Sequence, residues 1–258
     1  MKNIKACILC GSKRYEIFGI TKGCTGLMYF IVRCPECGSL FLPGKFDSME
    51  HNPDMGYVTV SKSSDRGRHI PRNKRYVLYN RDRRKAFRVY SDFIKRNKPS
   101  GKILDVGCGD GYFLTFFSRD KYERYGVEFN KNNYNRCLKN KLENVFYGRF
   151  RSFRTKKKFD VIVMLLYIAH SESSLANLRK CYRLLKKGGI IFLETGNANS
   201  DVARRLGTNG VFFREAPAHR YFPSDETIVK MLERAGFSDA EILVPKTEDI
   251  ISLWARKG

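Results

Sequence analysis

Four cysteines near the start of the chain have the residue type and spacing best suited to chemistry. Cys7 and Cys10 form one Cys-x2-Cys pair, Cys34 and Cys37 form a second, and a glycine follows each pair. Two intervening residues let one tight turn aim both sulfurs at a common point, and four thiolates make a closed tetrahedral site that suits Zn²⁺. The pattern therefore predicts a structural zinc site. Two redox Cys-x-x-Cys pairs are the alternative, but these are typical of a βαβ setting that the segment lacks.

A second group of residues is suited to holding a nucleoside-like ligand. A strand-like run leads into a turn that contains Gly107, Gly109 and Gly111, and glycines allow a tight turn that a ligand can approach closely. Glu128 stands 23 residues after Asp105, and a carboxylate at the end of the next strand can accept hydrogen bonds from two ribose hydroxyls. The spacing differs from the Gly-x-Gly-x-x-Gly of dinucleotide binders and from the phosphate loop. Together these residues predict a pocket for an adenosine-type ligand.

The elements that must position this pocket follow from the pattern of apolar residues. Short apolar runs alternate with helical patterns from about residue 102 onward, which predicts a parallel α/β sheet. Ligands bind such sheets at the carboxyl ends of the strands, where the glycine turn and Glu128 would lie. The expected strands are 102–106, 124–128, 145–147, 159–165 and 189–194, and the expected helices are 111–118, 131–139 and 173–185.

The chain before this sheet divides into two parts. Residues 1–45 carry the cysteine pairs and two short strand-like runs, so we expect a zinc ribbon in which the metal supplies stability that so small a core lacks. Residues 46–75 combine turn signals with little periodicity, which predicts a lid-like loop. A helix with an apolar face then ends at Asn97 and Lys98, before Pro99. Its opposite, cationic face either lies in solvent or binds an anion.

The region from residue 100 to the end resembles the class I S-adenosylmethionine-dependent methyltransferases. The run Asp105-Val-Gly-Cys-Gly-Asp-Gly is similar to the first motif of that family, and Glu128 is similar to its ribose-binding acid. The run from Phe159 to Val163 that leads to His170 resembles the fourth motif. The resemblance implies a Rossmann-like fold and S-adenosylmethionine as the cofactor.

The resemblance continues to the end of the chain. The stretch 184–194 resembles the helix, turn and strand that follow the fourth motif, and the stretch 219–237 looks like part of a subfamily with an N-terminal zinc ribbon. The implied sheet has seven strands, with 240–244 and 250–255 as the last pair. The cofactor-binding residues indicated by the motifs are Asp105, Gly107, Cys108, Gly109, Gly111, Glu128, Phe129, Gly148, Arg149 and Leu165.

Two positions depart from the pattern of this family. Arg149 stands where the family usually has an acid that meets the adenine amino group, so adenine recognition would rest on backbone groups. Ala169 precedes His170 where the family often has Glu-His, which leaves His170 without a neighbouring carboxylate. Both departures concern the contacts within the pocket rather than its presence.

The candidate catalytic residues are a base and its neighbours. Methyl transfer from a sulfonium is an in-line displacement, for which alignment and desolvation supply much of the rate. A hydroxyl or amine nucleophile also benefits from a base, and His170 is the first candidate because an unperturbed imidazole has a pKa near neutrality. A loop or helix-capping role is the alternative for His170. His219 and Tyr221 are further candidates, and Glu194, after the fifth strand, is a candidate for positioning the acceptor.

The formal net charge of +23 is unevenly distributed along the chain. Residues 62–98 hold 14 basic and three acidic side chains, and the stretch from Arg149 to Lys158 holds six cations without an acid. Such a field attracts polyanions, including RNA, DNA and anionic lipid. Solvated surface cations are the alternative, because no aromatic signature of nucleic-acid binding is interleaved with the charge.

Three functions are consistent with these residues. The leading one is an S-adenosylmethionine-dependent methyltransferase that acts on a small molecule, with a sugar or sugar-bearing metabolite as the favoured class. The alternative is a methyltransferase of rRNA or tRNA that docks through the zinc ribbon and the basic bridge, and a third is a non-catalytic zinc-ribbon scaffold with a retired methyltransferase domain. The predicted division is a zinc ribbon over 1–45, a lid-like loop and basic bridging helix over 46–98, and a methyltransferase domain over 99–258.

The apolar content predicts no membrane span. The longest apolar run, from Val161 to Ala169, has nine residues, whereas a bilayer needs about 20. The first residues show no apolar core of a secretory signal, so we expect a cytoplasmic protein, where cysteines bind metals more often than they form disulfides. The expected partners are a small-molecule acceptor and, through the cations, RNA or another polyanion. The sequence carries no signal for an oligomeric state.

Overall fold

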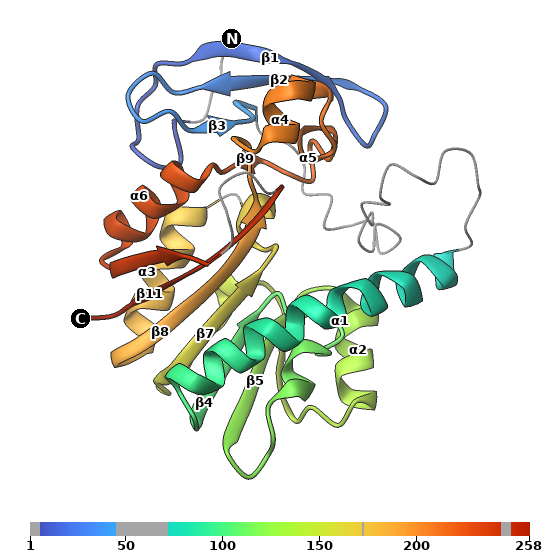
Figure 1. The fold of residues 1–258 in the computed structure, drawn as a ribbon, viewed down its shortest axis with the longest axis vertical. Helices are drawn as coiled ribbons and strands as arrows, with labels where there is room; N and C mark the ends of the chain where they lie inside the picture. The colour runs from blue at the N-terminus through green and yellow to red at the C-terminus, as the bar shows by residue number, and fades with distance from the viewer. Residues whose placement is uncertain (1–5, 45–71, 172, 244–248) are drawn as a thin grey trace.

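The structure, a computed structural model, describes residues 6–44, 72–171, 173–243 and 249–258. It contains a four-stranded sheet at one end of the molecule and a seven-stranded sheet with helices on both faces (Figure 1). Residues 46–71 of the predicted lid-like loop (46–75) lie outside the described residues, and residues 72–75 are helical rather than loop. None of the described helices is both long enough and apolar enough to cross a bilayer.

The seven-stranded sheet confirms the predicted α/β architecture. The strands are β4 (Gly101–Val106), β5 (Tyr122–Glu128), β6 (Asn144–Tyr147), β7 (Phe159–Leu165), β8 (Leu185–Gly196), β10 (Ser238–Ile242) and β11 (Ile250–Arg256). Their order is β10-β11-β8-β7-β4-β5-β6. Strands β4 to β8 run parallel, whereas β11 is antiparallel to both β8 and β10. Every predicted strand is present, including the final pair.

Two apolar cores lie on the two faces of this sheet. The helices are α1 (Arg72–Asn97), α2 (Lys131–Lys139), α3 (Ser174–Leu184), α4 (Asp201–Leu206), α5 (Val211–Arg214) and α6 (Asp225–Ala235). Helix α1 packs Tyr90 against Phe192 of β8, with ring centroids 5.0 Å apart. The next residue, Leu193, points to the other core, which α3 and α6 cover. Helix α1 ends before Pro99 as predicted, because the residue before a proline disfavours the helical region.

The helix predicted over 111–118 is instead a single 3₁₀ turn, η2 (Phe113–Phe116). Leu114 and Phe117 are fully buried, and Phe117 already has the extended angles φ −106° and ψ 118°. Only a few residues then remain before Tyr122 begins β5. The burial of these apolar side chains and the short connection leave no room for a longer helix.

The four-stranded sheet is assembled from both ends of the chain. Its strands, in spatial order, are β1 (Glu16–Lys22), β2 (Met28–Arg33), β3 (Leu40–Phe41) and β9 (Tyr221–Phe222). Leu40 pairs with Phe222, and Phe41 pairs with Tyr221. Buried Cys7 also belongs to the same apolar core as the α6 residues. The cysteine-bearing segment is therefore joined to the rest of the fold by a sheet and by a core.

The carboxyl ends of β4, β5, β6, β7 and β8 form one edge of the large sheet, which we name the carboxyl edge. The four-stranded sheet lies beyond this edge, at the top of Figure 1. The backbone N–H of Arg220, just before β9, donates to the carbonyl of Ala169, just after β7, at 2.8 Å. The loops that follow the parallel strands are therefore held close to the smaller sheet.

Candidate functional site

The turn after β4 requires glycines at the positions that the sequence singles out. Gly107, Gly109 and Gly111 have φ angles of +77°, +58° and +77°, in the region that side chains rarely adopt. A Cβ atom added to Gly107 would lie 2.7 Å from Cδ2 of Tyr167, and one added to Gly111 would overlap Leu142. The side chains packed around this turn therefore leave no room for a Cβ atom at Gly107 or Gly111.

Glu128 ends β5 beside this turn and is almost completely buried. Its Oε2 accepts a hydrogen bond from the backbone N–H of Gly109 at 2.8 Å, and its Oε1 accepts one from the N–H of Asn130 at 2.7 Å. Burial raises the pKa of Glu128 to about 7, although these N–H donors oppose the rise. Each carboxylate oxygen has two acceptor positions, so the group can still accept hydrogen bonds from ligand hydroxyls.

Asp105 lies in β4, just before the same turn, and its carboxyl group is buried. Its Oδ1 has no hydrogen-bond partner among the described residues. Burial, followed by the charges of Glu128 and Asp110, raises the pKa of Asp105 to about 8. A buried carboxyl oxygen without a partner costs free energy unless a ligand supplies a donor or a cation. Asp105 therefore fits a ligand that carries positive charge.

The remaining predicted cofactor residues also lie along the carboxyl edge. The N–H of Gly148 donates to the carbonyl of Glu128 at 2.8 Å, and Arg149 follows directly. Phe129 is partly exposed just beyond β5, and Leu165 is the last residue of β7. Cys108 differs, because its thiol points into the core, 3.9 Å from the sulfur of Cys137.

Tyr167 is a residue of this edge that the sequence did not single out. Its ring borders Gly107, and its hydroxyl accepts a hydrogen bond from Nδ2 of Asn177 at 3.4 Å. Leu166, just before it, has a φ of +55°, so the chain turns sharply as it leaves β7. Its place two residues after the end of β7 is the sequence signal that could have identified Tyr167, because ligands gather at strand ends.

A buried ion pair joins helix α1 to the same edge. Arg83 Nη2 donates to Oε2 of Glu194 at 2.8 Å, and its Nη1 lies 2.7 Å from Oε1. Glu194 is fully buried, and the guanidinium lies 4.8 Å from the centroid of the Phe87 ring. A two-pronged pair of this kind fixes geometry as well as charge. Glu194, a sequence candidate for positioning the acceptor, thus holds α1 in place.

The two candidate histidines lie together next to this edge. His170 ends a 3₁₀ turn, η4 (Ile168–His170), and its Nδ1 is 3.2 Å from the carbonyl oxygen of Ala218. Nδ1 of His219 is 2.9 Å from the carbonyl oxygen of Phe212. A carbonyl can only accept, so both Nδ1 atoms carry the proton and both Nε2 atoms keep a lone pair. The ring centroids are 4.7 Å apart, with the planes at 61°.

Both imidazoles are neutral near pH 7. Desolvation by the surrounding protein, with the charge of Arg220, lowers the pKa of His170, although part of this residue is exposed. Desolvation and the neighbouring His170 lower the pKa of His219 to about 3. His170 is therefore an accessible neutral base, whereas His219 is a more enclosed neighbour packed against it.

Tyr221, the third catalytic candidate, is not brought to the histidine pair. It is completely buried in β9, and its side chain lies among Ser39, Thr227 and the cysteines Cys7 and Cys37. Burial raises the pKa of its hydroxyl above the usual range. The structure thus places Tyr221 in the core beneath the cysteine cluster.

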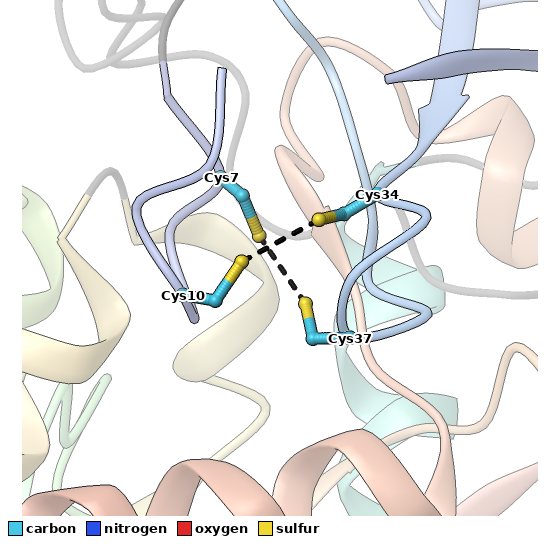
Figure 2. Close-up of side chains that lie close together, drawn as sticks. All are labelled: Cys7, Cys10, Cys34 and Cys37. Atoms are coloured by element: carbon cyan, nitrogen blue, oxygen red, sulfur yellow. Dashed lines mark hydrogen bonds between the residues drawn. The ribbon is translucent and has the colours of Figure 1, made fainter. Parts of the chain in front are cut away.

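The four predicted metal ligands converge on one point (Figure 2). The sulfurs of Cys7 and Cys37 are 3.5 Å apart, those of Cys10 and Cys34 are 3.4 Å apart, and all four lie within 4.8 Å of one another. A tetrahedral zinc with Zn–S bonds of 2.3 Å places its sulfurs about 3.8 Å apart. All eight cysteines lie in the described segments, and none forms a disulfide. The cluster is compatible with a small zinc-binding domain.

Comparison with known proteins decides the family. The methyltransferase domain family matches residues 79–242. The chain belongs to this family. The match begins at Tyr79, so the cysteine cluster lies outside it, and membership of a zinc-ribbon subfamily stays a prediction. The matched residues contain the glycine turn, Glu128 and both histidines of the site.

Relatives of known name differ in what they act on. A tRNA U34 carboxymethyltransferase from Campylobacter jejuni is 27% identical over 173 residues, which are 63% of this chain and 58% of the relative. A ubiquinone biosynthesis O-methyltransferase from Pelagibacter ubique is 32% identical over 101 residues, which are 37% of this chain and 42% of the relative. The chain thus spans less than two thirds of these relatives.

Solved structures share the fold of this chain. An S-adenosylmethionine-dependent methyltransferase from Thermotoga maritima aligns over 72% of this chain and 96% of its own, with a TM-score of 0.56 and 20% identity. The N-terminal domain of EvdMO1, solved with S-adenosylhomocysteine, aligns over 66% of this chain and 80% of its own, with a TM-score of 0.53 and 17% identity. The fold is that of the class I S-adenosylmethionine-dependent methyltransferases.

The residues of the carboxyl edge fit S-adenosylmethionine. The glycine turn leaves bare backbone at the end of β4, and Glu128 offers acceptors for ribose hydroxyls. The unpartnered oxygen of Asp105 suits the positive charge of this cofactor. Arg149 stands in place of the usual acid, and recognition of the adenine by backbone groups stays a prediction.

Proposed function

We propose that the protein transfers a methyl group from S-adenosylmethionine to an oxygen or nitrogen atom of a small-molecule acceptor. The observation that carries this proposal is the joint placement, at one sheet edge, of the glycine turn with Glu128 and of the neutral His170. The bound cofactor supplies a methyl group on a sulfonium, which is a good leaving group. A sugar or sugar-bearing metabolite is the acceptor class that the sequence resemblance favours.

In this proposal His170 is the general base. Its Nδ1–H donates to the carbonyl of Ala218, which leaves the lone pair of Nε2 to take the proton from the attacking hydroxyl or amine. The lowered pKa of His170 keeps the ring unprotonated near pH 7. His219 packs against its ring and positions it, and the Arg83–Glu194 pair holds α1 against the same edge.

Methylation of RNA is the second candidate. The relatives from Campylobacter jejuni that favour it are named for their action on tRNA. The longest run of cations near the site, however, leads from Arg149 away to Lys158 before β7, at the other end of that strand. The third hypothesis, a non-catalytic scaffold, requires loss of cofactor binding, and the intact glycine turn with Glu128 argues against it.

A labelled-methyl transfer assay tests these candidates. The zinc-loaded full chain is incubated with methyl-labelled S-adenosylmethionine and cell extract separated into RNA and small-molecule fractions. We expect label in the small-molecule fraction, and His170→Asn should slow transfer roughly 10²- to 10⁴-fold, the scale for losing a general base. Calorimetry should give the same cofactor affinity for both proteins.

The other outcomes of this assay are equally informative. Label in material that ribonuclease degrades would replace the small-molecule proposal by the RNA one. A folded protein that binds no S-adenosylmethionine would favour the scaffold. Full transfer by His170→Asn would remove His170 from the mechanism and leave the acceptor to be activated in another way.

We also infer that Cys7, Cys10, Cys34 and Cys37 hold one structural Zn²⁺. Four thiolate ligands leave no open position for water, so the ion would have no part in methyl transfer. Burial raises the pKa of the Cys7 thiol, and a bound cation is what would keep this thiol ionised. Metal analysis should give one zinc per chain, and Cys10→Ser should lower the content while Cys24→Ser, outside the cluster, should not.

A further inference from the structure

A group of cations lies at the edge of the seven-stranded sheet opposite the carboxyl edge. They precede β7, end α3, open β8 and follow β11, so they gather where the parallel strands begin. All but the last are exposed, and the last is half-buried. We name this surface the cationic edge; it comprises Lys156, Lys157, Lys158, Arg183, Lys186, Lys187 and Lys257.

Hydrogen bonds between these elements hold the cations side by side. Nζ of Lys158 donates to the carbonyl of Arg183 at 2.7 Å, and Nζ of Lys257 donates to the carbonyl of Leu185 at 2.9 Å. The charge of Lys158 also acts on Lys257, whose pKa is lowered by burial and then by this neighbour. The side chains of three elements therefore share one small area.

The irregular start of β8 carries two of the lysines. Phe159 faces Leu185 across the strands, whereas Val161 faces Ile190, so residues 186–189 stand out of the regular pairing. Gly188 in this segment has a φ of +67°, and a Cβ atom there would meet nothing within 4 Å. Residues 186–189 are thus a bulge at the start of β8: Gly188 and Gly189 pair with Lys257 on the side of β11, and the exposed Lys186 and Lys187 lie just before them.

Local structure explains only part of this charge. Lys186 forms an ion pair with Asp160 at 2.8 Å, and Lys158 binds a carbonyl in the last turn of α3, where cations are favourable. Lys156, Arg183 and Lys187 form no ion pair with any carboxylate in the described segments. Like charges that outnumber the nearby acids, such as Asp160 and Glu123, oppose folding. A negatively charged partner would compensate for this repulsion.

The geometry points to a surface that binds the phosphate backbone of duplex nucleic acid and anchors the enzyme to it. The cations lie at the starts of β7 and β8 and at the end of β11, three adjacent strands that span about 10 Å at the usual strand spacing. Phosphates of one strand rise by about 3.4 Å along a duplex, so about three of them match this width. Lysine and arginine side chains in such an arrangement neutralise phosphates without reading bases.

The absence of exposed apolar side chains favours nucleic acid over a lipid surface. The exposed large apolar residues among the described part of the chain lie elsewhere, several of them on β1 and β2, and none lies within 151–158, 183–189 or 256–258. Surfaces that bind membranes usually add apolar side chains to their cations. The lack of exposed aromatic rings also indicates backbone contacts rather than stacking with bases.

This surface is separate from the site of methyl transfer. Strand β7, with seven residues from Phe159 to Leu165, separates the two edges by about 20 Å. A duplex on the cationic edge therefore lies away from Glu128 and His170, and it serves as an anchor rather than as the acceptor. The inference does not depend on the small-molecule proposal, because binding is measured without methyl transfer.

Binding of a fluorescent RNA duplex of about 20 base pairs, measured by anisotropy, tests the inference. Sodium chloride is varied over roughly 50 to 200 mM, where phosphate contacts give a steep salt dependence. In the triple variant Lys156→Gln, Arg183→Gln and Lys187→Gln, the slope of log affinity against log salt should fall by about 3, and affinity by about tenfold or more. The matched control Lys13→Gln, Arg205→Gln and Lys230→Gln loses the same charge from exposed positions elsewhere and should change the slope by less than one.

Several outcomes would overturn the inference. Equal loss in both triple variants would indicate attraction by net charge alone, and no salt-dependent binding would remove the surface altogether. Tighter binding of the wild type to phosphatidylserine vesicles than to the duplex would assign the cationic edge to lipid. Methyl label in the bound duplex would make the surface part of a substrate site rather than an anchor. Unchanged circular dichroism and cofactor affinity show that each variant is folded.

Discussion

The two edges of the seven-stranded sheet differ in how they can recognise a partner. The carboxyl edge combines buried carboxyl groups, positive-φ glycines and two adjacent imidazoles, and Glu128 and His170 are held by specific hydrogen bonds. The cationic edge combines exposed lysines and an arginine with few fixed contacts. One edge is shaped for a single small ligand, whereas the other offers charge to an extended one. Substitutions that alter packing should therefore weaken ligand binding at the carboxyl edge, whereas added salt should weaken binding at the cationic edge.

The largest effect is expected from Gly107→Val. A Cβ atom at this position would lie 2.7 Å from Tyr167, and the φ of +77° is unfavourable for a branched side chain. We expect no measurable binding of S-adenosylmethionine by calorimetry. Gly188→Val is the matched control at the other edge, because it has a φ of +67° but meets nothing within 4 Å. Equal loss of cofactor binding in both variants would show that backbone strain alone, and not the site, is responsible.

Removal of the proposed zinc should affect the four-stranded sheet beyond the carboxyl edge and leave the cationic edge unchanged. Without metal, the four-stranded sheet loses the cluster that joins its loops, and the loss should extend to β9, which pairs with β3. Hydrogen exchange after treatment with a strong chelator should lose protection over 6–44 and 221–222, while the amides of β4 to β7 stay protected. Duplex binding at the cationic edge should not change. Full protection of 6–44 without metal would contradict a structural role for zinc.

An intermediate effect is expected from Glu128→Gln. Loss of the charged acceptor should weaken cofactor binding by about 1 to 3 kcal/mol, or roughly 5- to 150-fold in dissociation constant. Glu123→Gln provides the control, because Glu123 lies on the same strand toward the other edge and pairs with Lys102 at 3.0 Å. It should leave cofactor binding unchanged and slightly favour the duplex. Equal effects of the two variants on cofactor affinity would reject the assignment of Glu128.

The smallest effect is a dependence of cofactor binding on pH. The pKa values of Asp105 and Glu128 are raised to about 8 and about 7, so the folded protein holds protons there at pH 6. Binding of the cationic cofactor favours the ionised forms, and ionisation of Glu128 alone should raise affinity by up to about tenfold between roughly pH 6 and pH 8.5. Calorimetry at several pH values checks this, and Glu128→Gln should flatten the profile. A rise of the same size in Glu128→Gln would assign it to other groups.

The same protons should affect stability in the opposite direction. A carboxyl group whose pKa is raised by folding stabilises the folded state below its unfolded pKa, and this contribution is lost as the pH rises through the folded value. The melting temperature of the cofactor-free protein should therefore fall between about pH 6 and pH 8.5, in the range where cofactor affinity increases. A parallel rise of both quantities would show that these two carboxyl groups are not the cause.

Local sequence patterns predicted the elements that local forces determine. The apolar run at 159–165 became β7 with the same bounds, and 131–139 became α2. The Cys-x2-Cys-Gly turns also have local causes, because Gly11 and Gly38 take φ angles of +79° and +77°. The glycine turn was predictable for the same reason, since its spacing reflects a backbone that side chains cannot adopt.

Long-range contacts were beyond such patterns. The two-residue strand β9 has no periodicity of its own, and it exists because Tyr221 and Phe222 find β3 as a partner. The bidentate pairing of Arg83 with Glu194 depends on how α1 packs against the sheet, and local sequence patterns do not predict this packing. Tyr167 was missed because its role depends on the sharp turn at Leu166 rather than on a motif.

The pairing of β3 with β9 has a consequence for how the chain is made. The ribosome must add about 180 residues after Phe41 before Tyr221 exists to pair with it, which takes roughly 10 to 40 s at ordinary rates of synthesis. The cysteine cluster is complete much earlier, once Cys37 has emerged. A metal captured by the nascent chain would therefore keep the first strands together while their last partner is still being synthesised.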